Sequence, residues 1–256
     1  MRLLLSLSLI ISGCAPKNSD SNEDTSSATD TSGDTGDPVD TAGDSGSPED
    51  TGDTDDPESG FPEISGDCLV LDVELTDKVS SVFSNSINFG ETGFDEAYLS
   101  EGGTTLFETD NAGGSSLFSE IFAFELLHRC EDARLLKTET EITYTDSQGK
   151  ITDMLLEIDS VKIGVSVTRA FVYPPDTPYT NELAEELLEK KLAGVLDSSA
   201  NVGDEDAWEK QILHILAYSP DHQARVLESY QELDPSLTAD TIVMVTSTEG
   251  EDAFLY

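Results

Sequence analysis

The sequence predicts an α/β fold, with α+β as the alternative, for a single domain that spans residues 61–256. Two apolar segments separated only by Asp159 and Ser160 indicate a tight hairpin. The continuous apolar run TIVMVT at 241–246 is typical of a strand buried on both faces. Helix signals lie between these segments, and about 190 residues suffice for one sizeable core.

The first part of this domain is expected to contain a strand, a helix, a loop and a second helix. The alternation in CLVLDVEL at 68–75 indicates a strand. TDKVSSVFSNSI at 76–87 has its apolar residues at helical spacing. Residues 101–115 are rich in Gly, Thr, Asp and Asn and are expected to form a loop. SSLFSEIFAFELLHRC at 115–130 then has the periodicity of a helix.

Three strands follow in the order of a meander. LLKTETEITYTD at 135–146 and ITDMLLEID at 151–159 are expected to be joined by a loop that contains Gly149. VKIGVSVTRAFVY at 161–173 forms the third strand after the two-residue turn. The meander is therefore predicted to be antiparallel.

Helices are predicted between the meander and the last strand. Thr180 is a suitable N-cap for the helix NELAEELLEKKLAGVL. The apolar residues from Trp208 to Leu216 suggest another helix. Ser219 followed by Pro220 is expected to begin a third helix. The predicted order is thus helix, three-strand meander, helices and buried strand.

The two-residue turn fixes the register of the hairpin. Ile158 pairs with Val161, so Asp153 is expected directly across from Ser166, and Thr168 lies further along the same face. The opposite face carries Val161, Ile163, Val165 and Val167 and is predicted to be core.

This order of elements resembles the PD-(D/E)XK restriction-endonuclease-like fold. In that fold, an Asp on the second strand faces an acid-x-Lys motif on the third. The segment TDMLLEIDSVKIGVSVTRA fits this hairpin through Asp153, but it has Ser166 and Thr168 where the family has the acid and the Lys.

The resemblance implies a metal-dependent nuclease or phosphodiesterase as one candidate function. Some members move the acid to the following helix, where Glu182 lies with Lys190 or Lys191 beyond it. Others take an acid from the first helix, where Glu120 and Glu125 lie. The implied catalytic residues are Asp153, Glu182, Glu120, Glu125, Lys190, Ser166 and Thr168. Mg²⁺ would be held by Asp153 and Glu182, and it is the one cofactor implied.

The alternative is a hairpin with one apolar and one polar face that needs no cofactor and no catalysis. The charge of the chain favours this alternative. The chain carries a formal net charge of −40, and from Cys68 onward 37 acidic and 11 basic residues leave a net of −26. Such a surface repels phosphate backbones and anionic membranes, so nucleic acid is a disfavoured partner.

The N-terminus resembles that of a bacterial lipoprotein. An apolar run at residues 3–11 follows Arg2, and IISGC then matches the lipobox, which ends at Cys14. The resemblance implies that residues 1–13 are a signal peptide and that Cys14 is acylated. Ala15 rather than Asp after this Cys implies the outer membrane. The alternative is an ordinary signal peptide with a chance Cys.

Residues 14–60 are expected to form a disordered acidic tether after the lipidated Cys. Asp, Thr, Ser and Gly dominate this stretch, so it cannot bury enough apolar surface to fold. A calcium site is the alternative, but no window has the spacing of a calcium-binding loop.

Lipidation of Cys14 would leave Cys68 and Cys130 as a pair outside the cytosol, where disulfides persist. Two buried free thiols are the alternative. Taken together, the sequence predicts an outer-membrane lipoprotein that displays an acidic, non-catalytic domain. Its partners are expected to be the membrane, through the lipid anchor, and a protein or other component of the cell envelope.

Overall fold

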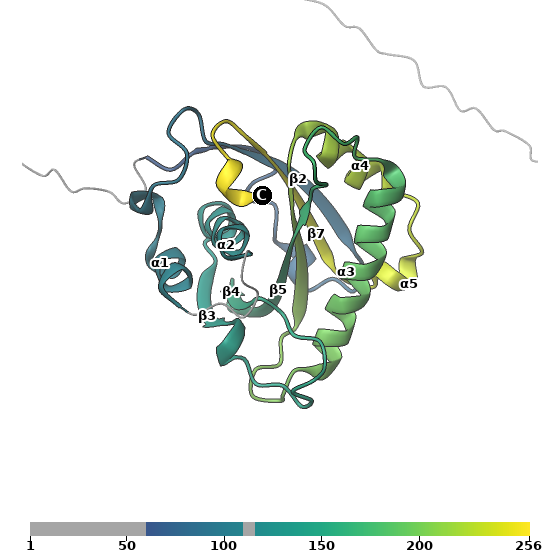
Figure 1. Ribbon diagram of the computed structural model, residues 1–256. Helices are drawn as coiled ribbons and strands as arrows, with labels where there is room; N and C mark the ends of the chain where they lie inside the picture. The colour runs from purple at the N-terminus through teal and green to yellow at the C-terminus, as the bar shows by residue number, and fades with distance from the viewer. Residues whose placement is uncertain (1–59, 110–115) are drawn as a thin grey trace, which may run out of the picture. The chain divides into compact units, whose positions relative to one another are not determined.

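The computed structural model describes residues 60–109 and 116–256. The predicted signal peptide, the lipidation site at Cys14 and all but the last residue of the predicted tether lie outside the described residues. The described residues form a single mixed α/β domain around a seven-stranded sheet, as predicted (Figure 1). Among the described residues, no helix combines the length and the hydropathy that a bilayer span requires.

The sheet has the strand order β1-β2-β7-β6-β5-β4-β3. Strands β2, β7, β6 and β5 are parallel neighbours, whereas β3, β4 and β5 form the predicted antiparallel meander and β1 pairs antiparallel with β2. The first strand of the meander, predicted at 135–146, ends at Thr138, because a capping box between Thr138 and Glu141 begins a 3₁₀ turn there. The strands are β1 Glu63–Gly66, β2 Ser81–Asn88, β3 Arg134–Thr138, β4 Met154–Ile158, β5 Val161–Ala170, β6 Lys210–Ala217 and β7 Ile242–Glu249.

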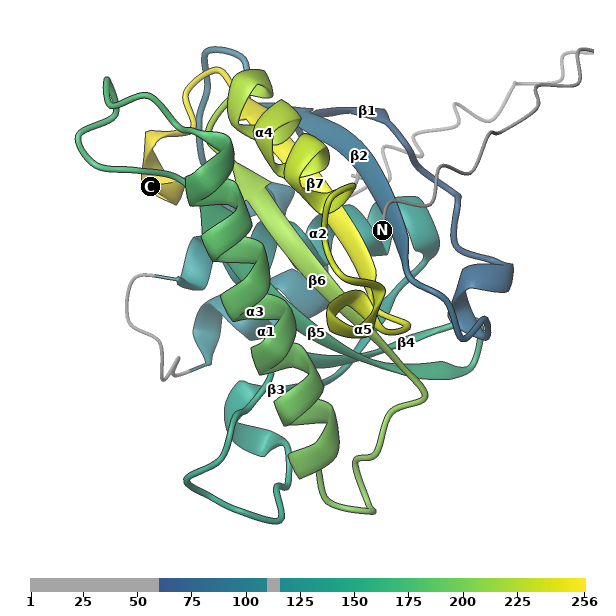
Figure 2. The same cartoon turned by 90° about the vertical axis from the view of Figure 1, so that its right-hand side faces the viewer.

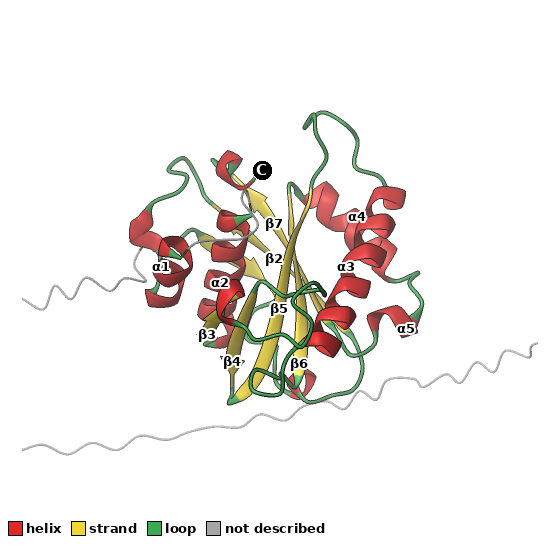
Figure 3. Ribbon diagram, turned by 60° about the horizontal axis from the view of Figure 1, so that its bottom comes forward, coloured by secondary structure: helices red, strands yellow, loops and turns green. Residues whose placement is uncertain are grey.

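Helices cover both faces of the sheet (Figures 1 and 3). One face is covered by α1 Glu101–Glu108 and α2 Leu117–Glu131. The other face is covered by α3 Asn181–Asn201, α4 Pro220–Tyr230 and the short α5 Pro235–Thr238, and Figure 2 shows α3 lying across this face. Four 3₁₀ turns complete the described elements: η1 Val73–Leu75, η2 Glu96–Tyr98, η3 Glu139–Glu141 and η4 Ala253–Leu255.

Two apolar clusters form the core, one on each face of the sheet. The side chains of β6 point to opposite faces of the sheet. Ile212 and Leu216 belong to the cluster that includes α2, whereas Leu213 and Ile215 belong to the cluster that includes α3 and α4. Every β6 residue is therefore buried. The predicted helix from Trp208 to Leu216 is wrong because a strand covered on both faces has no polar side to reveal its period.

A second prediction, a helix at residues 76–87, is wrong because strand β2 also has apolar residues on both faces. Residues 76–87 were expected to be helical, yet Ser81–Asn88 forms a strand parallel to β7. Val82 packs against the α3 side and Ile87 lies in the core on the α2 side. Apolar residues on both faces of one strand imitate helical spacing.

The predicted strand at 68–75 is also wrong. Cys68 forms a disulfide with Cys130 of α2, which confirms the predicted pair. The Glu131 carboxylate then accepts hydrogen bonds from the Val70 and Leu71 N–H groups, each at 3.1 Å. This segment therefore satisfies its backbone against the end of α2 instead of a neighbouring strand.

The expected loop at 101–115 is wrong over Glu101–Glu108, which is α1. Ser100 caps this helix by accepting from the Gly103 N–H at 3.2 Å. A Cβ at Gly102 would clash with the Phe124 ring. The glycines that suggested a loop instead let α1 pack closely on α2, and residues 110–115 of that prediction lie outside the described residues.

The hairpin, the helix caps and the last strand are confirmed. Ile158 pairs with Val161 across a turn in which Asp159 and Ser160 have φ angles of 48° and 68°. Thr180 and Ser219 cap α3 and α4 by accepting from backbone N–H groups. Strand β7 begins at Ile242, so it contains the predicted TIVMVT run except for Thr241, and it is buried except at its last residue.

Candidate functional site

Asp153 lies where the β4–β5 ladder ends. The last residue pair of the ladder is Met154 with Val165. The Asp153 N–H donates to the Val165 carbonyl at 3.1 Å, and its Oδ2 accepts from the Val167 N–H at 2.6 Å. The Ser166 hydroxyl does not reach this carboxylate, because it hydrogen-bonds the Thr152 hydroxyl at 2.9 Å. The expected Asp153–Ser166 pairing is thus replaced by one between Thr152 and Ser166.

The Asp153 carboxyl is strongly perturbed. Burial, together with repulsion from the nearby Glu120 and Glu139 carboxylates, raises its pKa from 3.8 to about 7. The Val167 N–H and the Lys191 ammonium act in the opposite direction without cancelling the effect. Asp153 therefore exchanges its proton near neutral pH, which is a property of many functional carboxyls.

Lys191 is the lysine of α3 that interacts with Asp153. Burial lowers its pKa, and the Asp153 carboxylate opposes that shift. The neighbouring Lys190 is exposed. Successive residues of a helix point in directions about 100° apart around its axis, so the two lysines cannot serve the same site. The structure thus brings Lys191 rather than Lys190 to Asp153.

Glu182 lies at the exposed start of α3. A hydrogen bond with Thr180 lowers the pKa of its carboxyl. Glu182 and Lys191 are nine positions apart, which corresponds to about 13 Å along the helix axis. The predicted ligand pair of Asp153 and Glu182 is therefore not brought together.

Glu120 and Glu125 take different roles on α2. Glu120 is buried and faces Asp153 closely enough to raise its pKa. Glu125 accepts from the Ser100 N–H at 2.7 Å and pairs with Arg129 at 3.1 Å, so its carboxylate holds α1 on α2. Because Glu120 and Glu125 are five positions apart on α2, their side chains point in directions about 140° apart around the helix axis. Only Glu120 can therefore belong to the Asp153 site.

Thr168 lines a cleft of about 650 Å³ at the far end of β5. Arg169 lies beside it and donates to the Leu255 carbonyl at 2.7 Å. The aromatic rings of Phe118, Phe171, Phe254 and Tyr256 form much of the remaining wall. Thr168 thus belongs to a largely aromatic cleft, and its hydroxyl supplies neither the charge nor the basicity of a lysine.

The donor set around Asp153 falls short of a magnesium site. Within residues 60–109 and 116–256, no group of three or more His, Cys, Asp or Glu side chains is arranged to hold a metal ion. Asp153 and Glu120 supply two carboxylates, and one Asp153 oxygen already accepts from Val167. Mg²⁺ requires near-octahedral oxygen ligands, so these residues do not fit it well.

Sequence reasoning missed Glu139, which contributes to the raised pKa of Asp153. It lies in η3, where the chain leaves β3 after a capping box between Thr138 and Glu141. The pattern of Thr138 followed three residues later by Glu141 is the one signal that could have indicated this turn.

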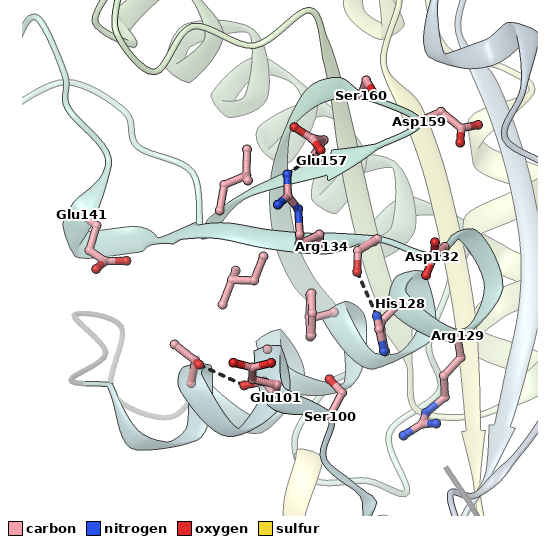
Figure 4. Close-up of a pocket in the computed structure, with 16 residues that line it drawn as sticks. Ser100, Glu101, His128, Arg129, Asp132, Arg134, Glu141, Glu157, Asp159 and Ser160 are labelled. Atoms are coloured by element: carbon pink, nitrogen blue, oxygen red, sulfur yellow. Dashed lines mark hydrogen bonds and ion pairs between the residues drawn. The ribbon is translucent and has the colours of Figure 1, made fainter. Parts of the chain in front are cut away.

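A groove opens on another part of the domain, between α1 and strand β3 (Figure 4). Its volume is about 870 Å³. Figure 4 shows Ser100 and Glu101 on one side, with Arg134 and Glu157 across the gap. We call this feature the β3 groove. Its walls include Phe124, Leu135, Leu136, Glu101, Asp132 and Asp159.

Together, the sheet, the helix layers and the disulfide define an extended mixed-sheet α/β domain. No family model matches the chain. The AAC-rich mRNA clone AAC4 protein of Dictyostelium discoideum is 38% identical over 164 residues, which cover 62% of this chain and 24% of that protein. The matched region thus spans about a quarter of the relative's length.

Among solved structures, the chain is similar to SfsA of Pyrococcus furiosus in complex with Ca²⁺. The two are 16% identical, with a TM-score of 0.29, over 52% of this chain and 56% of that one.

Proposed function

We propose that this protein is a lipid-anchored envelope protein whose acidic α/β domain binds a partner and does not catalyse a reaction. One observation carries the proposal. Strand β5 presents Ser166 and Thr168 where a restriction-endonuclease-like hairpin has its acid and lysine, and the Ser166 hydroxyl is engaged by Thr152. Neither hydroxyl can replace a carboxylate ligand or a lysine that stabilises developing phosphate charge.

The charge of the domain supports binding of a partner other than nucleic acid. The net charge of −26 from Cys68 onward repels a phosphate backbone, and the counterion release that drives non-specific binding requires cations on the protein. An acidic surface instead attracts basic partners and steers their association.

The anchoring part of the proposal rests on the N-terminal sequence. The Ile11-Ser12-Gly13-Cys14 lipobox follows a short apolar run, and the acidic low-complexity stretch comes after it. An acyl chain contributes about 0.8 kcal/mol for each buried CH₂ group, so several chains hold a protein at a membrane stably.

Metabolic labelling with palmitate in a Gram-negative host tests the anchor. The wild-type chain should take up label and partition into detergent, and Cys14→Ser should abolish both. The double variant Cys68→Ser/Cys130→Ser is the matched control, because it removes two other thiols and should label normally. Membrane retention of Cys14→Ser at a normal mature size would contradict a lipid anchor.

The second candidate is a metal-dependent nuclease of the PD-(D/E)XK type. It is favoured by the convergence of Asp153, Glu120 and Lys191 from three different elements, and by the order α2, β3–β4–β5, α3 and β6. Calorimetric titration with Mn²⁺ tests it. A real site should bind the ion, lose it in Asp153→Asn and keep it in Glu182→Gln, whereas no binding would remove this candidate.

A further inference from the structure

Strand β3 forms one edge of the sheet and borders the β3 groove. In the described sheet, β3 is the terminal strand and has β4 as its one neighbour. The outer side of β3 therefore has no strand neighbour and can accept an added strand, except that the Thr138 N–H at its end already donates to the Glu141 carboxylate at 2.9 Å. The other edge strand, β1, has four residues and borders none of the described clefts. The β3 edge is thus the edge of the sheet that combines a free side with a cleft.

The groove offers apolar and acidic contacts together. Phe124, Leu135 and Leu136 are among the residues that line it. A shift in the ladder between Leu135 and Lys137 leaves Leu136 without a partner on β4. A strand laid along β3 would meet these apolar side chains on one side of its pleat.

The charges around the groove are unbalanced. Five carboxylates and two guanidinium groups line it, which leaves a net charge of −3. Both guanidinium groups are already paired: Arg134 with Glu157 at 2.6 Å, and Arg129 with Glu125 at 3.1 Å. Within the described part of the chain, no ion pair involves the remaining groove carboxylates, which belong to Glu101, Asp132, Glu141 and Asp159.

We propose that the β3 groove binds an extended, basic segment of a partner protein, which adds to the sheet as a strand beside β3. This proposal rests on the proposed binding function and names the class of partner. Main-chain hydrogen bonds to β3 would supply affinity, and the surrounding side chains would supply selectivity. The five residues of β3 extend about 17 Å, so a segment of similar length matches the edge.

Charge decides between possible occupants. A second copy of this chain and its own residues 17–60 are both strongly acidic. Either would place carboxylates against the four groove carboxylates that form no ion pair, and such like-charge contacts oppose association. A basic segment instead gains from the same field. The occupant is therefore a different, cationic polypeptide.

The test uses the full chain in detergent and a fluorescein-labelled heptapeptide that alternates lysine and valine. Saturable binding is expected, with slower hydrogen exchange at the amides of residues 134–138. The triple variant Glu101→Gln/Asp132→Asn/Asp159→Asn removes three exposed groove carboxylates and should weaken binding about tenfold, since exposed pairs contribute about 0.5 kcal/mol each. Asn is suited to the positive φ angles of Asp132 and Asp159.

The matched control is Glu185→Gln/Glu186→Gln/Glu189→Gln on the exposed side of α3. It changes the net charge equally but should leave affinity within about twofold, because these positions lie on the other face of the sheet and are screened by salt. A second peptide, N-methylated at every backbone amide, keeps its charge but has no N–H group to donate to a ladder with β3. It should bind far more weakly.

Three results would overturn the proposal: no binding of the lysine–valine peptide, equal binding of the N-methylated peptide, or equal weakening in the α3 control variant. Any of these results, with palmitate labelling intact and no nuclease activity, would exclude the β3 groove as a peptide-binding site without contradicting the proposed function. Cleavage of nucleic acid by the same preparation would instead overturn the proposed non-catalytic function without affecting the peptide measurement.

Discussion

Replacing Asp153 with Asn should stabilise this protein at neutral and alkaline pH. The Asp153 carboxyl has a pKa of about 7, raised from 3.8 first by burial and then by Glu120. Ionising it in the folded protein is therefore costly. The Asn side-chain oxygen can still accept the hydrogen bond that Asp153 takes from the Val167 N–H, so the substitution removes the charge and keeps the contact.

The size of the effect follows from linkage between protonation and folding. Each pKa unit corresponds to about 1.4 kcal/mol, so a pKa of about 7 in the folded state against 3.8 lowers stability by about 4 kcal/mol once Asp153 is ionised. Because the pKa of this acid is raised by folding, its contribution is fully present below pH 4. It is lost progressively as the pH rises to 7.

Urea unfolding at pH 4, 6 and 8 measures this dependence. Asp153→Asn and wild type should have nearly equal stability at pH 4, and the variant should gain up to about 4 kcal/mol by pH 8. Asp197→Asn on the exposed side of α3 is the matched control and should change little at any pH. The variant Glu120→Gln should recover part of the gain, since Glu120 contributes to the raised pKa.

A pH-independent difference between wild type and Asp153→Asn would refute this reasoning. So would a loss of stability in Asp153→Asn at pH 8, since that would mean that the ionised carboxylate is stabilised by its surroundings.

Three further predictions concern the core. Replacing both Cys68 and Cys130 with Ser should lower the free energy of unfolding by about 4 kcal/mol, because the disulfide closes a loop with a sequence separation of 62; equal urea midpoints for the oxidised wild type and the double variant would contradict this. Gly164→Ala should cost about 1–3 kcal/mol and shift the tryptophan fluorescence, because the added Cβ would lie 2.6 Å from the ring of Trp208; unchanged stability and emission would show that the ring moves freely. Tyr179→Phe should leave stability unchanged or raise it by about 1 kcal/mol, because the tyrosine hydroxyl is buried without a hydrogen-bond partner in the described part of the chain; thermal unfolding measures the effect, and a clear loss would reveal a hidden partner.

The features that the sequence predicted correctly are those with local causes. The β4–β5 turn requires two residues with positive φ, and Asp159-Ser160 between alternating segments identifies it. The caps at Thr180 and Ser219 are likewise properties of a few neighbouring residues. The pairing of Cys68 with Cys130, 62 residues apart, is an exception, because it followed from the parity of the cysteines and not from a local pattern.

The features that were missed depend on distant contacts. Strands β2 and β6 have apolar residues on both faces: in β2 these residues imitate helical spacing, and in β6 complete burial leaves no polar face to reveal a strand. The segment that follows Cys68 is shaped by the Glu131 carboxylate, 60 or 61 residues away in sequence. No local pattern could reveal that bond.

The candidate site was predicted only in part, because it also depends on contacts between residues that are distant in sequence. The hairpin identified Asp153, and the family resemblance indicated both Glu120 and Lys191 among other residues. Whether Lys190 or Lys191 faces Asp153 depends on the rotation of α3 against the sheet, which is set by burial of Ala184, Leu188 and Leu192. Helix phase is a tertiary property that residue spacing alone does not determine.

The central claim is that this domain binds a partner and does not cut nucleic acid. Incubation of the purified full chain with single- and double-stranded DNA and RNA, in Mg²⁺ and separately in Mn²⁺ across pH 6–9, tests that claim most directly. We expect all substrates to remain intact, with wild type and Asp153→Asn indistinguishable. Metal-dependent cleavage by wild type that disappears in Asp153→Asn and persists in Glu182→Gln would contradict the claim and establish Asp153 as a catalytic residue.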